Sequence, residues 1–161
     1  MKAITFDFIN LGGVRRMFAI PPSSFKSIFY NRSKNLHFLN VIKRQNIIDI
    51  YFTEDTGEFV EDEKRTPAGP SYDIEISGII PKSNPLNQKQ LIELDQGHWY
   101  VLFQDNNEMI RLAGNKDNQL RFERTGKTGQ SVSNRNQIEF SFKGLQSKPC
   151  YFISLDEIDD I

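Results

Sequence analysis

The stretch Gln137-Ile138-Glu139-Phe140-Ser141-Phe142 alternates strictly between polar and apolar residues. Side chains of a β-strand point to opposite faces in turn, so a period of two is typical of a strand with one face in a core. The same alternation recurs in Ile4-Thr5-Phe6-Asp7-Phe8 and in Tyr72-Asp73-Ile74-Glu75-Ile76. We therefore expect a mainly β protein, built as an antiparallel β-sandwich or a partly closed barrel.

Turn and breaker residues divide the rest of the chain. Gly12-Gly13 supplies the positive φ that a tight turn needs, and Pro21-Pro22 ends the next segment because proline cannot donate to a strand ladder. The apolar residues of 23–44 have partly helical and partly irregular spacing, so the sequence does not decide between helix and strand for this segment. Strands are expected at 3–9, 14–20, 47–52, 72–80, 99–104, 109–114, 120–124, 137–142 and 150–153.

One short helix is expected at about residues 87–96. Asn87 has the side chain of an N-cap, and Gly97 stands where a glycine commonly follows a helix. The intervening Leu91, Ile92 and Leu94 form a short apolar stripe, which is long enough for three turns at most.

Length and composition favour one folded domain. The chain has 161 residues, of which 38% are hydrophobic and 25% charged, and a chain of this size buries a core without disulfides or metals. Thirteen Phe against one Trp suggest a core rich in phenylalanine, whose side chain has no polar group. We expect a single β-rich domain over residues 1–155, followed by an acidic tail at 156–161.

The longest break in the strand pattern covers residues 53–71, which are rich in charge, Pro and Gly. Loops of this length without secondary structure are uncommon in compact domains and are often functional. We expect this one to be mobile in an isolated subunit and ordered by another copy or a neighbouring protein, with an idle insertion as the alternative. The interface residues expected within it are Phe59, Val60, Lys64, Arg65, Pro67 and Pro70.

Residues that usually carry catalysis or bind metal are scarce. His37 and His98 are far apart in the sequence, with no Cys or carboxylate at ligand spacing, and Cys150 is the only cysteine. Gly126-Lys127-Thr128-Gly129 ends like a phosphate-binding loop, but the leading glycine is absent and a strand follows, so we expect a turn. We therefore expect no catalytic residue, no cofactor, no metal, no small-molecule substrate and no enzymatic activity.

Charge and aromatic residues leave one alternative function open. The formal net charge is −1, which argues against attraction of the whole molecule to nucleic acid. Basic residues nevertheless interleave with aromatic residues, and β-barrel proteins stack bases on exposed rings. A binding module for single-stranded nucleic acid or for a partner protein is therefore the alternative. The two basic groups are Lys26, Arg32, Lys34, Lys43 and Arg44 with Phe25, Phe29, Tyr30 and Phe38, and Arg121, Arg124, Lys127 and Arg135 around Phe122.

The N-terminal segment does not predict export. Asp7 interrupts the apolar run, and no small-residue cleavage site follows it. No stretch approaches the roughly eighteen apolar residues of a membrane span. The lone thiol of Cys150 fits a reducing compartment better than a secreted scaffold. We expect a protein that is made in the cytosol, stays soluble and does not contact membranes.

The C-terminal third of the chain has a family resemblance. Residues 99–107 carry a strand and an Asp-Asn turn, and Arg111-Leu112-Ala113-Gly114, Leu120-Arg121-Phe122 and Thr128-Gly129 follow. Asn136-Gln137-Ile138-Glu139-Phe140-Ser141-Phe142-Lys143-Gly144 completes the pattern. It resembles the C-terminal part of small β-rich virion proteins of Bacteroidetes-type phages and prophages. That family pattern has no catalytic set.

The resemblance implies a structural role in a phage or phage-like particle, in the tail or neck. Tail-tube-like subunits look like β-sandwiches with one helix and a long loop that reaches a neighbouring subunit. The implied partners are further copies of this chain or other virion proteins. The implied location is the virion, after synthesis in the bacterial cytoplasm.

Overall fold

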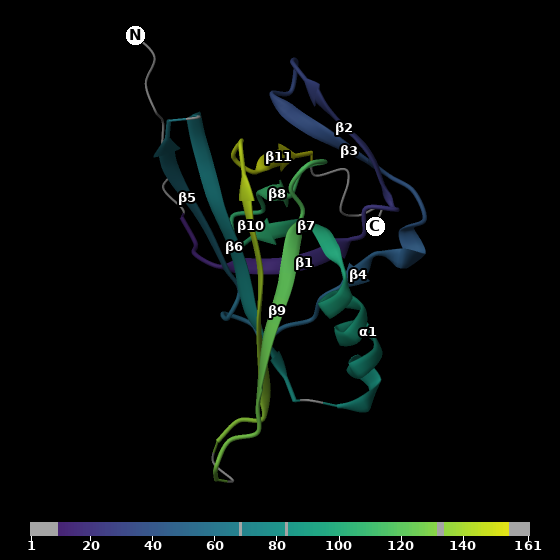
Figure 1. Ribbon diagram of the computed structural model, residues 1–161, viewed down its shortest axis with the longest axis vertical. Coiled ribbons are helices and arrows are strands. Elements are labelled where there is room, and N and C mark those ends of the chain that lie inside the picture. The colour runs from purple at the N-terminus through teal and green to yellow at the C-terminus, as the bar shows by residue number, and fades with distance from the viewer. Residues whose placement is uncertain (1–9, 68, 83, 132–133, 155–161) are drawn as a thin grey trace.

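The computed structural model describes residues 10–154 apart from 68, 83, 132 and 133. This part of the chain is mainly β with one α-helix, so the expected fold class is confirmed. The strands form one large mixed sheet that is not closed into a barrel, and the arrangement is sandwich-like (Figure 1). The strand expected at 3–9 and the acidic tail at 156–161 lie outside the described residues.

One layer, which we call sheet A, is built around β7. This strand pairs with β1 on one side and β8 on the other, both antiparallel. β11 pairs with β8 and makes one parallel bridge to β3, so the hairpin of β2 and β3 continues the sheet, while β4 extends it beyond β1. Sheet A contains β1 (Val14–Ile20), β2 (Phe25–Asn31), β3 (Leu36–Val41), β4 (Ile48–Asp49), β7 (His98–Asp105), β8 (Ile110–Ala113) and β11 (Tyr151–Ile153).

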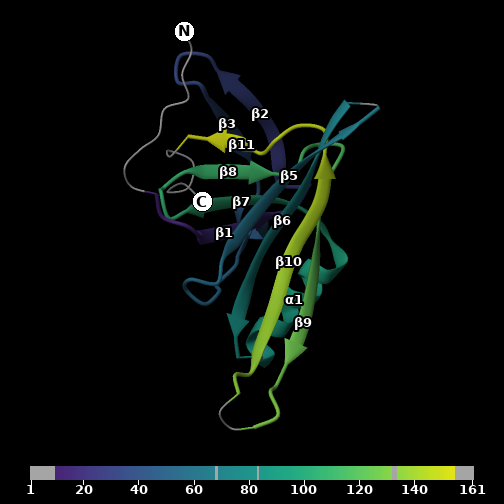
Figure 2. The ribbon, with the colours of Figure 1, turned by 90° about the vertical axis from the view of Figure 1, so that its left-hand side faces the viewer.

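The second layer, sheet B, has the strand order β9-β10-β6-β5 and is antiparallel throughout. A short pairing of Trp99 in β7 with Leu120 in β9 joins it to sheet A. Its strands run across those of sheet A, which is the crossed form of sheet packing (Figures 1 and 2). Sheet B contains β5 (Glu58–Thr66), β6 (Gly69–Pro81), β9 (Leu120–Lys127) and β10 (Gln137–Gln146).

A core rich in phenylalanine fills the space between the two sheets. Phe122, Phe140 and Phe142 of sheet B contact one another, with ring centroids 5.0 to 6.2 Å apart. Phe103 of sheet A belongs to the same buried cluster. The buried face of β10 therefore matches the apolar positions of its alternating sequence.

A second core lies on the other face of sheet A. Tyr100 and Leu102, which alternate along β7 with the residues of the first core, pack there against β8 and the β2–β3 hairpin. The rings of Phe25 and Tyr100 stack with centroids 4.1 Å apart. β7 is therefore buried on both faces, which explains its continuous apolar run. Residues 23–44 thus contain two paired strands, which settles the choice left open by their spacing.

The helix α1 (Pro85–Gln96) contacts sheet B beside β9 (Figure 1). It begins earlier than expected because Asn84, and not Asn87, is the N-cap: the side chain of Asn84 accepts a hydrogen bond from the backbone N–H of Asn87. Pro85 at the first helical position favours this start, since the N–H that proline lacks would have no partner there.

The apolar stripe of α1 is narrower than expected. Leu91 and Leu94 are buried, but Ile92 is exposed. Gly97 follows the helix with an extended φ of −101°, so it is not needed for a left-handed turn. A Cβ at this position would lie 2.6 Å from the ring of Trp99, so Gly97 makes room for that ring.

Two expectations about residues 47–71 are wrong. The strand expected at 47–52 is only the two-residue β4, after a 3₁₀ turn at Arg44–Asn46, and Ile50 and Phe52 enter the core from irregular backbone. The loop expected at 53–71 is mostly a β-hairpin, since β5 pairs with β6 along its whole length. Backbone hydrogen bonds hold this polar segment, and they do not require apolar side chains.

Candidate functional site

The hairpin formed by β5 and residues 69–77 of β6 carries the expected interface residues, and we call it the acidic hairpin. Its root is fixed to the body of the protein. Phe59 points inward onto Phe103, with centroids 4.6 Å apart, and the guanidinium of Arg111 lies 5.3 Å from the Phe59 ring. The carboxylate of Glu61 accepts a 2.7 Å hydrogen bond from the backbone N–H of Cys150. Phe59 therefore anchors the root of the hairpin, and its expected place at an interface stays a prediction.

The outer face of β5 is exposed. Val60 leaves 43% of its surface in solvent and stands between Glu58 and Asp62 on the same face of the strand. β5 ends the strand order, so its outer edge has no strand partner among the residues that the structure describes. The N–H and C=O groups of such an edge can pair with a strand of another chain.

The tip of the acidic hairpin is exposed as well. Lys64 forms an ion pair with Asp73 on the neighbouring strand, and this contact raises the pKa of Lys64. Arg65 lies 3.7 Å from Glu63. Both strands are paired within one chain, so the expectation of a segment ordered only by a neighbour is wrong. The other exposed predicted residues at the tip are Pro67 and Pro70.

Charge is divided between two consecutive parts of the chain. Residues 10–48 contain seven Lys or Arg and no Asp or Glu, whereas residues 49–81 contain nine Asp or Glu and two Lys or Arg. The first part includes the β2–β3 hairpin and the second the acidic hairpin, and Figure 1 shows these on opposite sides of the molecule. The net charge of −1 conceals this division, and a running count of charge along the sequence would have revealed it.

A pocket of about 380 Å³ lies on the face of sheet A that points away from sheet B, and we call it the lysine pocket. Its floor is apolar and belongs to the second core. Three lysines reach it from β2, from the β8–β9 connection and from the β10–β11 connection, and no ion pair joins them to any acidic residue that the structure describes. The lining residues that matter here are Lys26, Lys116, Lys148, Asp117, Phe25 and Leu112.

The two groups of basic and aromatic residues noted in the sequence differ in how exposed their aromatic side chains are. On the β2–β3 hairpin, Phe29 and Phe38 stack with centroids 5.6 Å apart, and Lys34 Nζ lies 5.4 Å from the Phe38 ring. Phe29 is 55% exposed, so this hairpin presents an aromatic surface. In the second group, Lys127 pairs with Glu139 inside sheet B, and Arg124 pairs with Asp95 of the helix, whose hydrogen bond raises the pKa of Arg124. Arg121 donates a hydrogen bond to His98, and Phe122 is buried.

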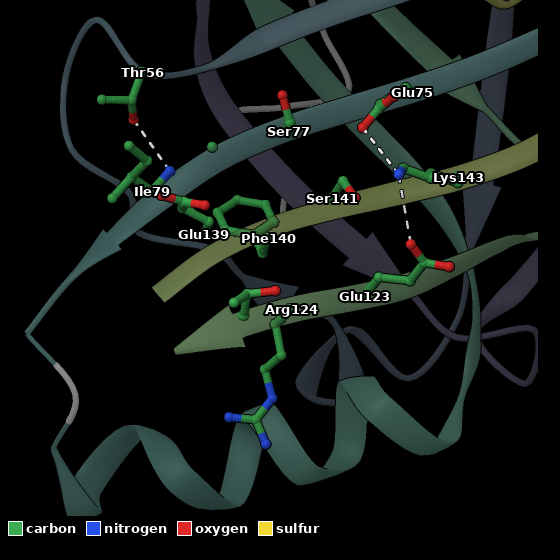
Figure 3. A pocket seen from close by; sticks show the side chains of 12 residues that line it. Thr56, Glu75, Ser77, Ile79, Glu123, Arg124, Glu139, Phe140, Ser141 and Lys143 are labelled. Atoms are coloured by element: carbon green, nitrogen blue, oxygen red, sulfur yellow. Dashed lines mark hydrogen bonds and ion pairs between the residues drawn. The ribbon is translucent and has the colours of Figure 1, made fainter. Parts of the chain in front are cut away.

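A wider groove of about 560 Å³ crosses the outer face of sheet B (Figure 3). At its centre, Lys143 lies 3.4 Å from Glu75 and 3.5 Å from Glu123, each on an adjacent strand. The Arg124 side chain points away from the groove toward α1, as Figure 3 shows. Lys143 thus pairs with carboxylates on both neighbouring strands, and cross-strand pairs of this kind stabilise a sheet.

The side chains that most often act in catalysis, the cysteine and the two histidines, lie in different parts of the protein. Burial and the nearby Glu61 carboxylate raise the pKa of the Cys150 thiol, which disfavours the reactive thiolate. His37 packs between Tyr30 and Tyr151, with ring centroids 5.1 and 4.7 Å away, and His98 accepts a hydrogen bond from Arg121.

Neither a metal centre nor a spanning helix occurs in the described part of the chain. No three His, Cys, Asp or Glu side chains of residues 10–154, outside the four internal gaps, gather closely enough to hold a metal ion. No helix within the same residues has the length and apolar character to cross a membrane. Gly126 and Lys127, expected in a turn, are the last residues of β9.

No protein-family model, no curated protein and no solved structure matches this chain. The resemblance of residues 99–144 to phage virion proteins therefore stays a prediction. The functional argument depends on the surfaces described above.

Proposed function

We propose that the protein is a non-enzymatic assembly subunit of a phage or phage-like particle, in its tail or neck. The segment that resembles small β-rich virion proteins, residues 99–144, forms β7 to β10 and contributes to both layers of the sandwich. One helix packs against the sandwich, and a hairpin reaches beyond its body (Figure 2). Both features support the comparison with tail-tube-like subunits, which is a comparison of folds.

The observation that carries the proposal is the exposed edge of β5. This strand has nine residues, and only β6 pairs with it among the described strands. Folded proteins usually protect such edges with charge, and Glu58 and Asp62 fit that rule. Val60 between them is an exposed apolar side chain, and the unpaired N–H and C=O groups of such an edge can pair with a strand of another chain. The partners are then further copies or other virion proteins.

Sedimentation of the purified protein over a concentration series tests this proposal, with negative-stain microscopy of the most concentrated sample. We expect growth with concentration into rings or tubes. Val60→Asp should shift the equilibrium toward the monomer, whereas Leu86→Asp should not, since Leu86 is 84% exposed on α1 and is not part of the edge. A monomer at every concentration would contradict the proposal.

Binding of single-stranded nucleic acid is the second candidate, and the β2–β3 hairpin favours it. The exposed Phe29, its stack on Phe38 and the excess of basic residues in 10–48 form a surface on which bases could stack. Titration with a labelled oligothymidine at two salt concentrations measures it. Binding should weaken with salt, and Phe29→Ala should weaken it further. Equal signals for parent and variant would exclude this surface.

A further inference from the structure

The outer face of β5 and the lysine pocket have complementary chemistry. Along β5, Glu58, Val60 and Asp62 stand on one face at intervals of about 6.6 Å, so a carboxylate lies on each side of an exposed apolar side chain. Neither Glu58 nor Asp62 has an ion pair with a described residue. This surface therefore offers two negative charges around a small branched apolar group, and Asp62 also interacts electrostatically with Lys64.

The lysine pocket offers the reverse pattern. Its floor includes Phe25 and Leu112, and its three lysines outnumber Asp117, the one acidic residue among the described residues that line it. Lys26 lies at the bulge where the pairing of β2 with β3 shifts between Phe25 and Ser27, so it has no partner residue on β3. A small apolar group flanked by carboxylates fits an apolar floor surrounded by lysines.

We propose that the lysine pocket of one copy receives the outer face of β5 of a second copy, with Val60 against the apolar floor and Glu58 and Asp62 near the lysines. This inference rests on the proposed assembly function and names the contact by which assembly takes place. Charge complementarity supports it, because each copy carries both halves of the contact: Glu58 and Asp62 on β5, and Lys26, Lys116 and Lys148 at the pocket.

One chain cannot make this contact with itself. Val60 lies on the face of sheet B that points away from sheet A, whereas the pocket lies on the face of sheet A that points away from sheet B. Each bound copy therefore leaves one β5 face and one pocket free at the two ends of the pair. Such a head-to-tail contact continues into a ring where the rotation closes and into a filament where it does not.

A polypeptide suits the pocket better than a nucleic acid does. The exposed Phe29 and the partly buried Phe38 on which it stacks are not part of the pocket lining, and the floor is formed by side chains of the second core. The net charge of −1 also disfavours a long polyanion, while a short acidic strand meets only the local lysines.

The test compares assembly of parent and variants by sedimentation at about 50 and about 500 mM NaCl, where salt weakens contacts between exposed charges. The double variant Lys26→Glu, Lys148→Glu changes the pocket, and Asp62→Lys with Val60→Asp changes the β5 face. Each should weaken self-association by at least about tenfold. Lys89→Glu on α1, which lines neither surface, is the matched control and should assemble like the parent. Thermal midpoints check that each variant is folded.

Mixing the two variants gives the sharper result. The pocket variant keeps an intact β5 face and the β5 variant keeps an intact pocket, so the mixture should form one-to-one pairs and stop there. If the parent assembles and the pocket variant assembles equally well, this inference is wrong but the proposed assembly function still stands. A parent that stays monomeric would overturn both. If removal of residues 155–161 abolishes assembly while the β5 variant assembles normally, the acidic segment 156–160 is the occupant and the assignment to β5 is wrong.

Discussion

The backbone N–H of Cys150 donates a 2.7 Å hydrogen bond to Oε2 of Glu61, across 89 positions of the sequence. This bond joins the residue before β11 of sheet A to the edge strand of sheet B. An ionised acceptor makes it stronger than a bond between neutral groups. The root of the acidic hairpin is therefore held by a polar contact in addition to the packing of Phe59.

Glu61→Ala should lower the free energy of unfolding by about 1 to 3 kcal/mol, because it leaves the partly buried N–H of Cys150 without its acceptor. Glu61→Gln keeps an acceptor oxygen and should cost less. Urea unfolding of the two variants measures the difference, with Glu58→Ala on the exposed face of the same strand as the control. Equal losses for Ala and Gln at position 61 would show that the bond contributes little.

Stability should fall with rising pH above about 9 because of Cys150. Burial, followed by the Glu61 carboxylate, raises the pKa of this thiol above its ordinary value of 9.0 in the folded chain. The unfolded chain then binds fewer protons than the folded chain at high pH, so the free energy of unfolding declines, by up to about 1.4 kcal/mol per pH unit. Cys150→Ala should lose this part of the slope in urea unfolding at several pH values. Parallel slopes for parent and variant would refute the prediction.

Phe140→Ala should cost about 3 to 5 kcal/mol, since the side chain is 3% exposed and contacts Phe52, Phe122 and Phe142. Phe29→Ala is the control, because more than half of that side chain is in solvent. Thermal unfolding should show a large drop in midpoint for the first variant and a small one for the second. An unchanged midpoint for Phe140→Ala would place this residue outside the core.

Replacing residues 65–70 by Asn-Gly should shorten the acidic hairpin and leave the rest of the protein folded. Lys64 and Ser71 are paired, so a two-residue turn between them keeps the register of β5 and β6. Assembly should survive, because the Val60 face is retained. Sedimentation of the shortened protein decides the point: loss of assembly would assign the contact to the removed tip, which includes Arg65, Pro67 and Pro70.

Sequence patterns predicted the strands whose two faces differ. Residues 72–80 and 137–142 alternate because one face of β6 and β10 packs into the core while the other meets solvent. β5 escaped prediction because it lies at an edge and carries polar residues on both faces, so only its backbone pairing defines it. The run 47–52 was predicted as a strand because most of its residues are apolar. Ile50 and Phe52 do pack into the core, but from backbone that is not part of a strand.

The candidate surfaces were predicted only in part. Val60 was expected at an interface and is exposed, but the inward direction of Phe59 depends on the register of β5 with β6, which local sequence does not determine. The lysine pocket could not be predicted from spacing. Its lysines come from three segments that are distant in sequence, and only the crossing of the two sheets and the fold of the β2–β3 hairpin bring them together.

β7 belongs to both cores, and this has a consequence for cooperativity. Trp99, Val101 and Phe103 pack into one core, while Tyr100 and Leu102 pack into the other. Because β7 contributes side chains to both cores, its displacement exposes both of them to solvent. The two cores are therefore expected to unfold in one transition. Amide hydrogens of β7 should then exchange with solvent only through global unfolding, whereas those at the tip of the acidic hairpin should exchange through local fraying. The body of the protein is then expected to unfold in one step, while the tip of the acidic hairpin opens locally.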